Sequence, residues 1–336
     1  MIRKLSYWML LLFWMLLVNR SVTPTQAAFV PETSIPVEMY VLNQYGEKVN
    51  NLLCTDDTKD MQGCTAFFKY SEAYRENNNT AISYPYTTSQ PLIHVEDEYL
   101  PNVVTMELNP DVFGTGPQAL RAQAIAARSY ALHWFENKQE SFALNNSNQH
   151  QVYVPYAFDA LNPKKNVPNI ATARCSRPTS EQNAFQQAIC AAVAPRYYLS
   201  YSTGDLPAFA EFFSDVPLQT VTSPEKPNYL LSVPDPISTT DCAGTTGHAR
   251  GMSQLGAIRW ERGKNCSQDW SVKWTRAEQI LFHYYTHVHL RDAGASDLPI
   301  QSAPKRFNVL NVSGLPAQWV WNGTYQAQIQ VQNTGI

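Results

Sequence analysis

The spacing of apolar residues predicts two well-defined helices in the first half of the chain. Between residues 100 and 108, apolar side chains recur at three- and four-residue intervals, which places them on one helix face. Gly116-Pro117 then opens a second helix, because proline is well tolerated in a first turn. Most of the stripe on this second helix is alanine, so the helix can approach a neighbour closely. The first face consists of Leu100, Val103, Val104 and Leu108, and the second of Leu120, Ala124, Ala127, Ala131 and Trp134.

Further helices and strands follow without a regular alternation of strand and helix. Such a mixture favours an α+β domain rather than a doubly wound parallel sheet. The helix predicted from Thr275 begins with a capping-box pattern. The other predicted helices cover 181–193 and 253–263, and the predicted strands cover 37–42, 151–154, 197–201 and 209–213.

The first 28 residues have the layout of a secretory signal peptide. Two positive charges precede an apolar run of about 14 residues, and small residues stand at Ala27-Ala28. The run is short for a spanning helix. We therefore expect export, and contact with a membrane only if residues 1–28 are kept as an anchor.

The last part of the chain has a different pattern. Residues 292–305 have the composition of a linker, and residues 325–332 alternate apolar and polar side chains with a period of two. That alternation is typical of a half-buried strand. About 30 residues cannot close a sandwich of roughly 100. We therefore expect 306–336 to be a partial β domain, the start of a truncated β-sandwich.

Composition narrows the function further. Charged residues make up 16% of the chain, the formal net charge is −3, and no basic stripe exists. The electrostatic attraction on which nucleic-acid binding depends is therefore missing. Six cysteines in an exported chain indicate disulfides, and six allow 15 pairings. Proximity in the sequence favours Cys54–Cys64, Cys175–Cys190 and Cys242–Cys266.

Glu107 lies on the apolar face of the first predicted helix, four residues after Val103 and three after Val104. A carboxyl group on such a face loses hydration, which raises its pKa. A glutamic acid that stays protonated near neutral pH can serve as a general acid. The alternative is a helix-end glutamate that reaches solvent or pairs with an arginine.

A second candidate segment contains three glycines within residues 247–256. His248, Ser253 and Gln254 are polar side chains beside these glycines, suited to binding sugar hydroxyl and acetamido groups. The alternative is structural: the glycines permit a bend, and Ser253 caps the helix that follows.

Several separated motifs resemble the SpoIID/LytB family, in the right order, over residues 92–291. The stretch YLPNVVTMELNP…QALRAQAIAARSYAL resembles the first signature of this family, and GHARGMSQLGA…EQILFHYY resembles the second. HQVY at 150–153 and NYL…DP at 228–236 fit intermediate elements. Residues 29–91 would form the N-terminal strand and loop region of the same domain.

The resemblance implies an α+β domain with a glycan groove and a peptidoglycan lytic transglycosylase activity that uses one acid, at the position of Glu107. In such an enzyme the sugar's own hydroxyl attacks, so a second carboxylate is not needed. A non-catalytic module that binds peptidoglycan and stimulates a cell-wall amidase is the alternative from the same family. The candidate groove residues are Gln151, Tyr153, His248, Ser253 and Gln254, to which we add Arg128, although solvent exposure is the default interpretation for Arg121 and Arg128.

The chain departs from the family pattern at three places. Some relatives hold zinc through a Cys/His cluster, but His150 stands at its cysteine position, so we predict no metal or other cofactor. The histidines at 283, 287 and 289 lack a carboxylate or cysteine partner in the pattern and are a weak metal signal. Ala249 replaces a glycine, and residues 214–217 replace a glycine-rich stretch, which leaves room for the binding-module alternative.

The cysteine content gives a first testable prediction. If all six cysteines are paired, titration of the mature protein with a thiol reagent in denaturant should find close to no reactive thiol. The same titration after reduction is the control and should reveal all six. Six reactive thiols without reductant would contradict an exported, oxidised protein.

Overall fold

The computed structural model describes most of the chain between residues 33 and 293. The described residues are 33–59, 61, 63–65, 84–109, 114–137, 144–161, 174–201, 206–226, 228–241 and 243–293, with the backbone of 301–302, 308–313 and 328–332. The predicted signal segment 1–28 lies outside them. Among the described helices, none combines the length and apolarity needed to cross a membrane.

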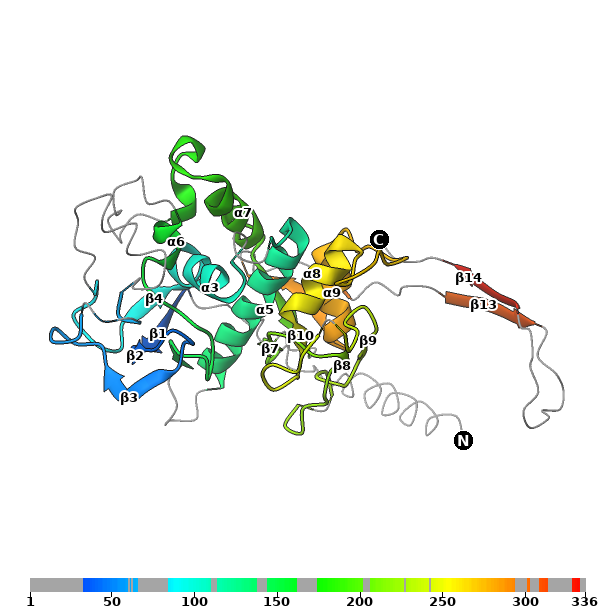
Figure 1. Cartoon of the computed structure of the whole chain (residues 1–336), viewed down its shortest axis with the longest axis horizontal. Coiled ribbons are helices and arrows are strands. Elements are labelled where there is room, and N and C mark those ends of the chain that lie inside the picture. The colour runs from blue at the N-terminus through cyan, green and yellow to red at the C-terminus, as the bar shows by residue number, and fades with distance from the viewer. Residues whose placement is uncertain are drawn as a thin grey trace, which may run out of the picture.

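The protein is a mixed α+β structure, as predicted, with the long helix α5 (Pro117–Glu136) at its centre (Figure 1). Helices α3 (Leu100–Glu107) and α7 (Ala184–Val193) pack on one side of α5, and α8 (Gln254–Arg262) and α9 (Ala277–Tyr284) on the other. A turn of π-helix, Val95–Tyr99, leads into α3. The short helix α6 (Ala157–Ala160) and the 3-10 turns Arg174–Ser176 and Thr179–Glu181 complete the helical elements of the described residues.

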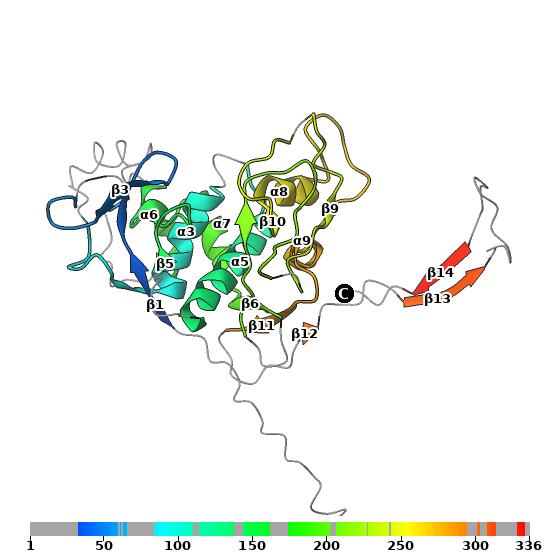
Figure 2. The same ribbon diagram turned by 90° about the horizontal axis from the view of Figure 1, so that it is seen from below.

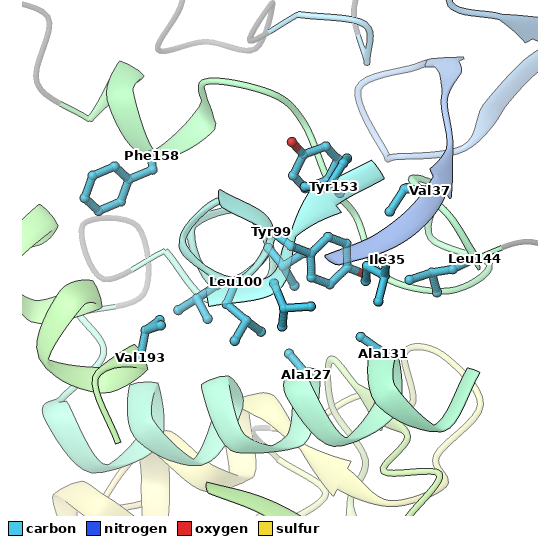
Figure 3. Packing of buried hydrophobic residues seen from close by; sticks show 14 of the residues in the cluster. Ile35, Val37, Tyr99, Leu100, Ala127, Ala131, Leu144, Tyr153, Phe158 and Val193 are labelled. Carbon is cyan, nitrogen blue, oxygen red and sulfur yellow. The ribbon is translucent and has the colours of Figure 1, made fainter. Parts of the chain in front are cut away.

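Helix α5 is buried on two faces and separates two hydrophobic cores. We define the first core as the cluster around α3, α7 and the N-terminal strands, and the predicted stripe of α5 packs into it. Ala127 and Ala131 of this stripe point toward Tyr99 and Leu100 (Figure 3). A second face enters the second core, the cluster around α8 and α9. Small side chains allow close packing on both sides, since alanine adds little width to a helix. The first face carries Leu120, Ala124, Ala127 and Ala131, and the second Ala119, Ala122, Ile125 and Ala126.

The N-terminal strands cover the first core. Strand β1 (Ser34–Glu38) pairs antiparallel with β4 (Leu92–His94) and parallel with β5 (Leu144–Asn145), and β2 (Tyr40–Leu42) pairs with β3 (Lys48–Leu53) (Figure 2). The predicted strand over 37–42 is thus divided at Met39, whose N–H donates to the carbonyl of Ser89 at 2.8 Å.

Strands of the second half are short. Strand β11 (His289–Asp292) pairs with β6 (Tyr197–Ser200) and β12 (Gln301–Ser302), so the predicted linker contains paired residues. Strand β7 (Phe212–Phe213) pairs parallel with β10 (Met252–Ser253), and β8 (Leu218–Gln219) pairs with β9 (Pro234–Asp235). Only the end of the predicted strand 209–213 therefore enters a ladder.

The predicted strand over 151–154 is wrong. These residues join no ladder, because their backbone N–H groups have other partners. The N–H of Val152 donates to the Glu107 carboxylate at 2.6 Å, and that of Tyr153 to the Asn146 carbonyl at 3.0 Å. The segment is held beside α3 by these bonds.

Local capping explains where the helices begin. Helix α7 starts later than predicted because Asn183 caps it, accepting from the N–H of Gln186 at 2.9 Å. Helix α8 starts after Ser253, as predicted. In front of α9, Gln279 rather than Glu278 reaches back, and its amide oxygen accepts from the N–H of Arg276 at 3.1 Å.

Two of the three predicted disulfides are present as predicted, Cys54–Cys64 and Cys175–Cys190, and both lie against the first core. Cys266 is also disulfide-bonded, while Cys242 is outside the described residues.

The period-two pattern near the C-terminus is confirmed over β14 (Gln328–Gln332), which pairs antiparallel with β13 (Asn308–Ser313).

Candidate functional site

Glu107 is the last residue of α3, directly after a run of buried helix positions. Its side chain is partly exposed, whereas Val103 and Val104 on the same helix are fully buried. One carboxylate oxygen, Oε1, accepts the N–H of Val152 at 2.6 Å, and the other, Oε2, accepts from Nε2 of Gln254 at 3.2 Å. Among the described residues no arginine pairs with Glu107, and its carboxyl group is strongly desolvated although the residue as a whole is partly exposed.

The surroundings of this carboxyl group favour its neutral form. Burial of the carboxyl raises the pKa of Glu107 to about 7, while the bonds from Val152 and Gln254 act in the opposite direction. Its position at the C-terminal end of a helix adds to the first effect, because the helix dipole is negative there. At neutral pH a large fraction of Glu107 therefore carries a proton, as a general acid requires.

Gln254 joins the second signature to the first. It is the first residue of α8, and its Nε2 donates both to the side chain and to the backbone carbonyl of Glu107, each at 3.2 Å. The same nitrogen lies 3.5 Å from Oε1 of Gln123 on α5. Residues 147 positions apart in the sequence thus meet at one carboxyl group.

Ser253 is buried and caps α8, accepting from the N–H of Gly256 at 3.0 Å, so the structural interpretation holds for this residue.

The glycine loop before α8 follows a tight path. Gly251 has a φ of +76°, and a Cβ on it would lie 2.0 Å from the carbonyl oxygen of Glu211. Only glycine permits this approach. Ala249, where the family pattern has glycine, also adopts a left-handed φ of 57°. An alanine in this region carries a steric cost of about 1–2 kcal/mol.

His248, the remaining predicted residue of this loop, lies at the edge of an ion pair. Arg250 binds both carboxylate oxygens of Glu211, at 2.9 and 2.6 Å, and Nε2 of His248 is 3.9 Å from one of them. Nδ1 of His248 accepts from the N–H of Arg250 at 3.0 Å. Burial lowers the pKa of His248, although Glu211 opposes this effect. The ring also makes a hydrogen bond to the backbone of Phe212, so both of its nitrogens have partners.

Tyr130 lies within electrostatic range of both Glu107 and this ion pair. It lies on α5, its ring stacks on Phe209 with centroids 4.9 Å apart, and its pKa is raised by burial and by the charges of both Glu211 and Glu107. The sequence analysis did not single out Tyr130 or Glu211. Tyr130 lies on the helix of the first signature, but nothing in the local pattern distinguishes it from a core residue.

Arg128 does not line a binding surface. Its guanidinium is fully buried and binds both carboxylate oxygens of Glu96, at 2.7 and 2.6 Å. It also donates to the carbonyls of Val193 and Tyr197, at 2.9 and 2.8 Å. The sequence analysis offered two interpretations of Arg128, exposure to solvent and contact with a substrate. A fully buried guanidinium with these partners fits neither. Arg128 ties α5 to the turn before α3 and to the chain between α7 and β6.

Gln151 and Tyr153 also face inward. Gln151 is fully buried, with its amide oxygen accepting from the Tyr99 hydroxyl at 2.8 Å and its amide nitrogen donating to the Ala127 carbonyl at 3.2 Å. Tyr153 is fully buried, stacks on Tyr99 and bonds through its hydroxyl to Tyr86 at 2.7 Å (Figure 3). These residues hold the 150–153 segment so that the neighbouring Val152 N–H meets Glu107.

His150, at the family's cysteine position, has structural partners, as do two of the histidines near the end of the domain. Nδ1 of His150 accepts the N–H of Asn145 at 3.0 Å, and its ring packs edge-on against Trp134. His283 packs against the stacked pair Trp260 and Trp274, and His287 contacts the carbonyl of Asn228. Within the described ranges, no three side chains of histidine, cysteine, aspartate or glutamate converge.

Comparison with known proteins identifies one domain. Residues 87–196 match the SpoIID protein family, described as stage II sporulation protein. This match confirms the SpoIID/LytB resemblance predicted from the sequence, and it includes α3 with Glu107 and the whole of α5. A search among curated proteins found no match to the chain.

The buried Arg128 leads to a prediction about stability. Replacing Arg128 by Gln leaves the Glu96 carboxylate and several carbonyls without their donor, and should lower the free energy of unfolding by about 3–5 kcal/mol. Arg121→Gln on the same helix is the control, since Arg121 is partly exposed, and should cost about 1 kcal/mol or less. Urea denaturation measures both. Equal, small effects would show that the clamp around Arg128 is not formed.

The environment of Glu107 predicts how stability depends on pH. The folded-state pKa of about 7 lies above the unfolded value near 4.5, so the stability that protonation contributes is complete below pH 4.5 and is lost as the pH rises through 7. Glu107→Gln cannot lose a proton. As the pH rises from 4.5 to 7, the free energy of unfolding of Glu107→Gln should therefore increase relative to that of the unaltered protein, by up to roughly 3 kcal/mol. A difference in unfolding free energy that stays constant with pH would contradict the raised pKa.

Proposed function

We propose that this protein is an exported peptidoglycan lytic transglycosylase that cleaves glycan strands with Glu107 as its single acid and base. The observation that carries the proposal is the carboxyl group of Glu107, which has a pKa of about 7 and is held between the two signature segments by Val152 and Gln254. The SpoIID match supports a role connected with peptidoglycan. The two disulfides fit an oxidising compartment outside the cytosol.

The proposed chemistry follows from which carboxyl oxygen is free to carry the proton. Because Oε1 accepts the short bond from the Val152 N–H, the acidic proton belongs on Oε2. Glu107 gives this proton to the glycosidic oxygen as the bond from that oxygen to the anomeric carbon of the muramic sugar breaks. The C6 hydroxyl oxygen of the same sugar then bonds to the anomeric carbon, and its proton passes to Glu107. The product is a 1,6-anhydro-muramic end, and the acid is regenerated.

Two further contacts fit a single-acid mechanism. Gln254 can remain bonded to Glu107 in both protonation states, since its amide nitrogen donates to the carboxylate and also to the Glu107 carbonyl. The second carboxylate in the neighbourhood, Glu211, is held by Arg250 through two bonds. An ion-paired carboxylate is a poor base, so Glu211 is not positioned to activate a water as a second catalytic carboxylate would.

A non-catalytic module that stimulates an N-acetylmuramoyl-L-alanine amidase is the second candidate. It is favoured by the loop at 214–217, where Asp215 is committed to a buried pair with Arg259 at 2.7 Å. It is also favoured by the inward orientation of Arg128, Gln151 and Tyr153, which removes three predicted sugar contacts.

Replacing Glu107 by Gln separates the two functions. The substitution keeps size and hydrogen bonding but removes the transferable proton, so turnover should fall by about 100- to 10,000-fold. Purified glycan strands, with and without stem peptides, should be digested and the products identified by mass spectrometry. The Arg121→Gln variant serves as the active control.

Each product pattern has one meaning. Anhydro-muramic ends that disappear in Glu107→Gln support the lyase. Reducing ends indicate a hydrolase. Binding of the strands without any product, by the unaltered protein and the variant alike, supports the amidase-stimulating module and contradicts the lyase.

A further inference from the structure

A group of aromatic side chains lies next to Glu107 and has no part in the chemistry described above. We call it the aromatic patch and define it as Tyr130, Trp134, His150, Phe209 and Phe212. It combines three separate segments: the last turns of α5, the segment that carries Val152, and the residues from Phe209 to the start of β7. Except for Tyr130, which is 6% exposed, each member is partly exposed.

The rings of the patch are arranged as a continuous surface. Tyr130 stacks on Phe209 at 4.9 Å between centroids and lies 6.5 Å from Phe212. Trp134 stands edge-on to His150 at 4.6 Å and to Phe209 at 6.0 Å. Large rings pack at this spacing in cores. Here the apolar side chains Phe209 and Phe212 pack against both cores at once, so the patch lies at the seam between the two halves of the fold.

The patch is continuous with the catalytic acid. Tyr130 is close enough to Glu107 and to Glu211 to feel both charges, and His150 lies two residues before Val152, the donor to Glu107. A ligand whose scissile bond reaches Glu107 therefore extends over these rings or over the ion pair beside them.

The charges around the patch cancel. Glu211 and Arg250 form an ion pair, and Lys226, which lies 6.0 Å from the Phe209 ring, follows the exposed Glu225. Lys48, whose charge acts on His150, interacts in turn with Glu38. His150 and His133 are neutral at physiological pH, because burial lowers the pKa of each to about 4. A surface of ring faces with hydrogen-bonding groups at its border and no net charge suits a neutral, amphipathic ligand rather than an anion.

We propose that the aromatic patch is a sugar-binding subsite that holds an N-acetylhexosamine ring of the strand next to the bond at Glu107. Pyranose rings present C–H groups on one face, which pack on an aromatic face, and hydroxyl groups at the edge, to which the partly exposed side chain of Arg250 can donate. This subsite rests on the proposed function and supplies the sugar contacts that the buried Gln151 and Tyr153 do not.

Trp134 provides the test, in the full chain carrying Glu107→Gln so that the probe is not cleaved. The probes are a hexamer of β-1,4-linked N-acetylglucosamine and glycan strands without stem peptides. Trp134→Ala should weaken binding of both, measured by titration calorimetry, by about tenfold or more. Trp270→Ala is the matched control, because Trp270 is also partly exposed but packs on Trp260 away from the patch. It should leave the affinity within about twofold.

A second variant keeps the test valid if Trp134→Ala loses its fold. Trp134→Phe retains an apolar ring, and the change in tryptophan emission on adding saccharide should disappear in it but persist in Trp270→Phe. If variants at Trp134 and at Trp270 show the same affinities and the same emission changes, the patch is not a sugar-binding subsite, and the proposed function is unaffected. If Glu107→Gln binds neither probe and the unaltered protein cleaves no glycan, the subsite and the proposed function both fail.

Discussion

The structure depends on a helix that is buried on both sides. Helix α5 gives one face to the first core and a second face to the other, and most of the side chains on both faces are alanine. Two cores can therefore approach each other across the width of a single backbone. Glu107 comes from an element of the first core and Gln254 from an element of the second, and they meet because α5 is thin enough for α3 and α8 to reach one another. A larger residue on either face would separate the acid from its amide partner.

The same arrangement explains how a carboxyl group can be both desolvated and reachable. Glu107 ends α3 and contacts α8 through Gln254, and there the residue stays partly exposed although its carboxyl group is desolvated. Ionisation is disfavoured by the surroundings, while the bonds from Val152 and Gln254 fix the orientation of the group. Those bonds in turn require the fully buried Gln151 and Tyr153 on one side and the Ser253 cap on the other. Most of the polar residues near the acid thus act on the backbone that holds it.

Local periodicity was sufficient to predict most of the helices and the desolvated carboxyl group of Glu107. The stripe on α5, the Ser253 cap of α8 and the position of Glu107 on an apolar face all depend on residues within a few positions of one another, which a sequence displays directly. The roles of Arg128, Gln151 and Tyr153 depend on partners that are distant in the sequence. For Arg128 these are Glu96 and the carbonyls of Val193 and Tyr197, which the spacing of residues along the chain cannot predict. For the same reason the pattern did not identify Glu211 or Tyr130 as neighbours of the acid. The predicted strand at 151–154 failed because a side chain, rather than a second strand, took the backbone donor.

The two described disulfides have a consequence for the order in which the molecule matures. They close short loops, with separations of 10 and 15 residues, and both lie in the first core. The contact between Glu107 and Gln254 spans 147 residues. Short loops close early in folding, whereas distant contacts form only when most of the chain is in place. A newly made chain can therefore be cross-linked while its acid is still an ordinary, hydrated glutamate. Docking of the second core then places Gln254 against it, so oxidation of the cysteines and completion of the surroundings of Glu107 are separate events in the life of the molecule.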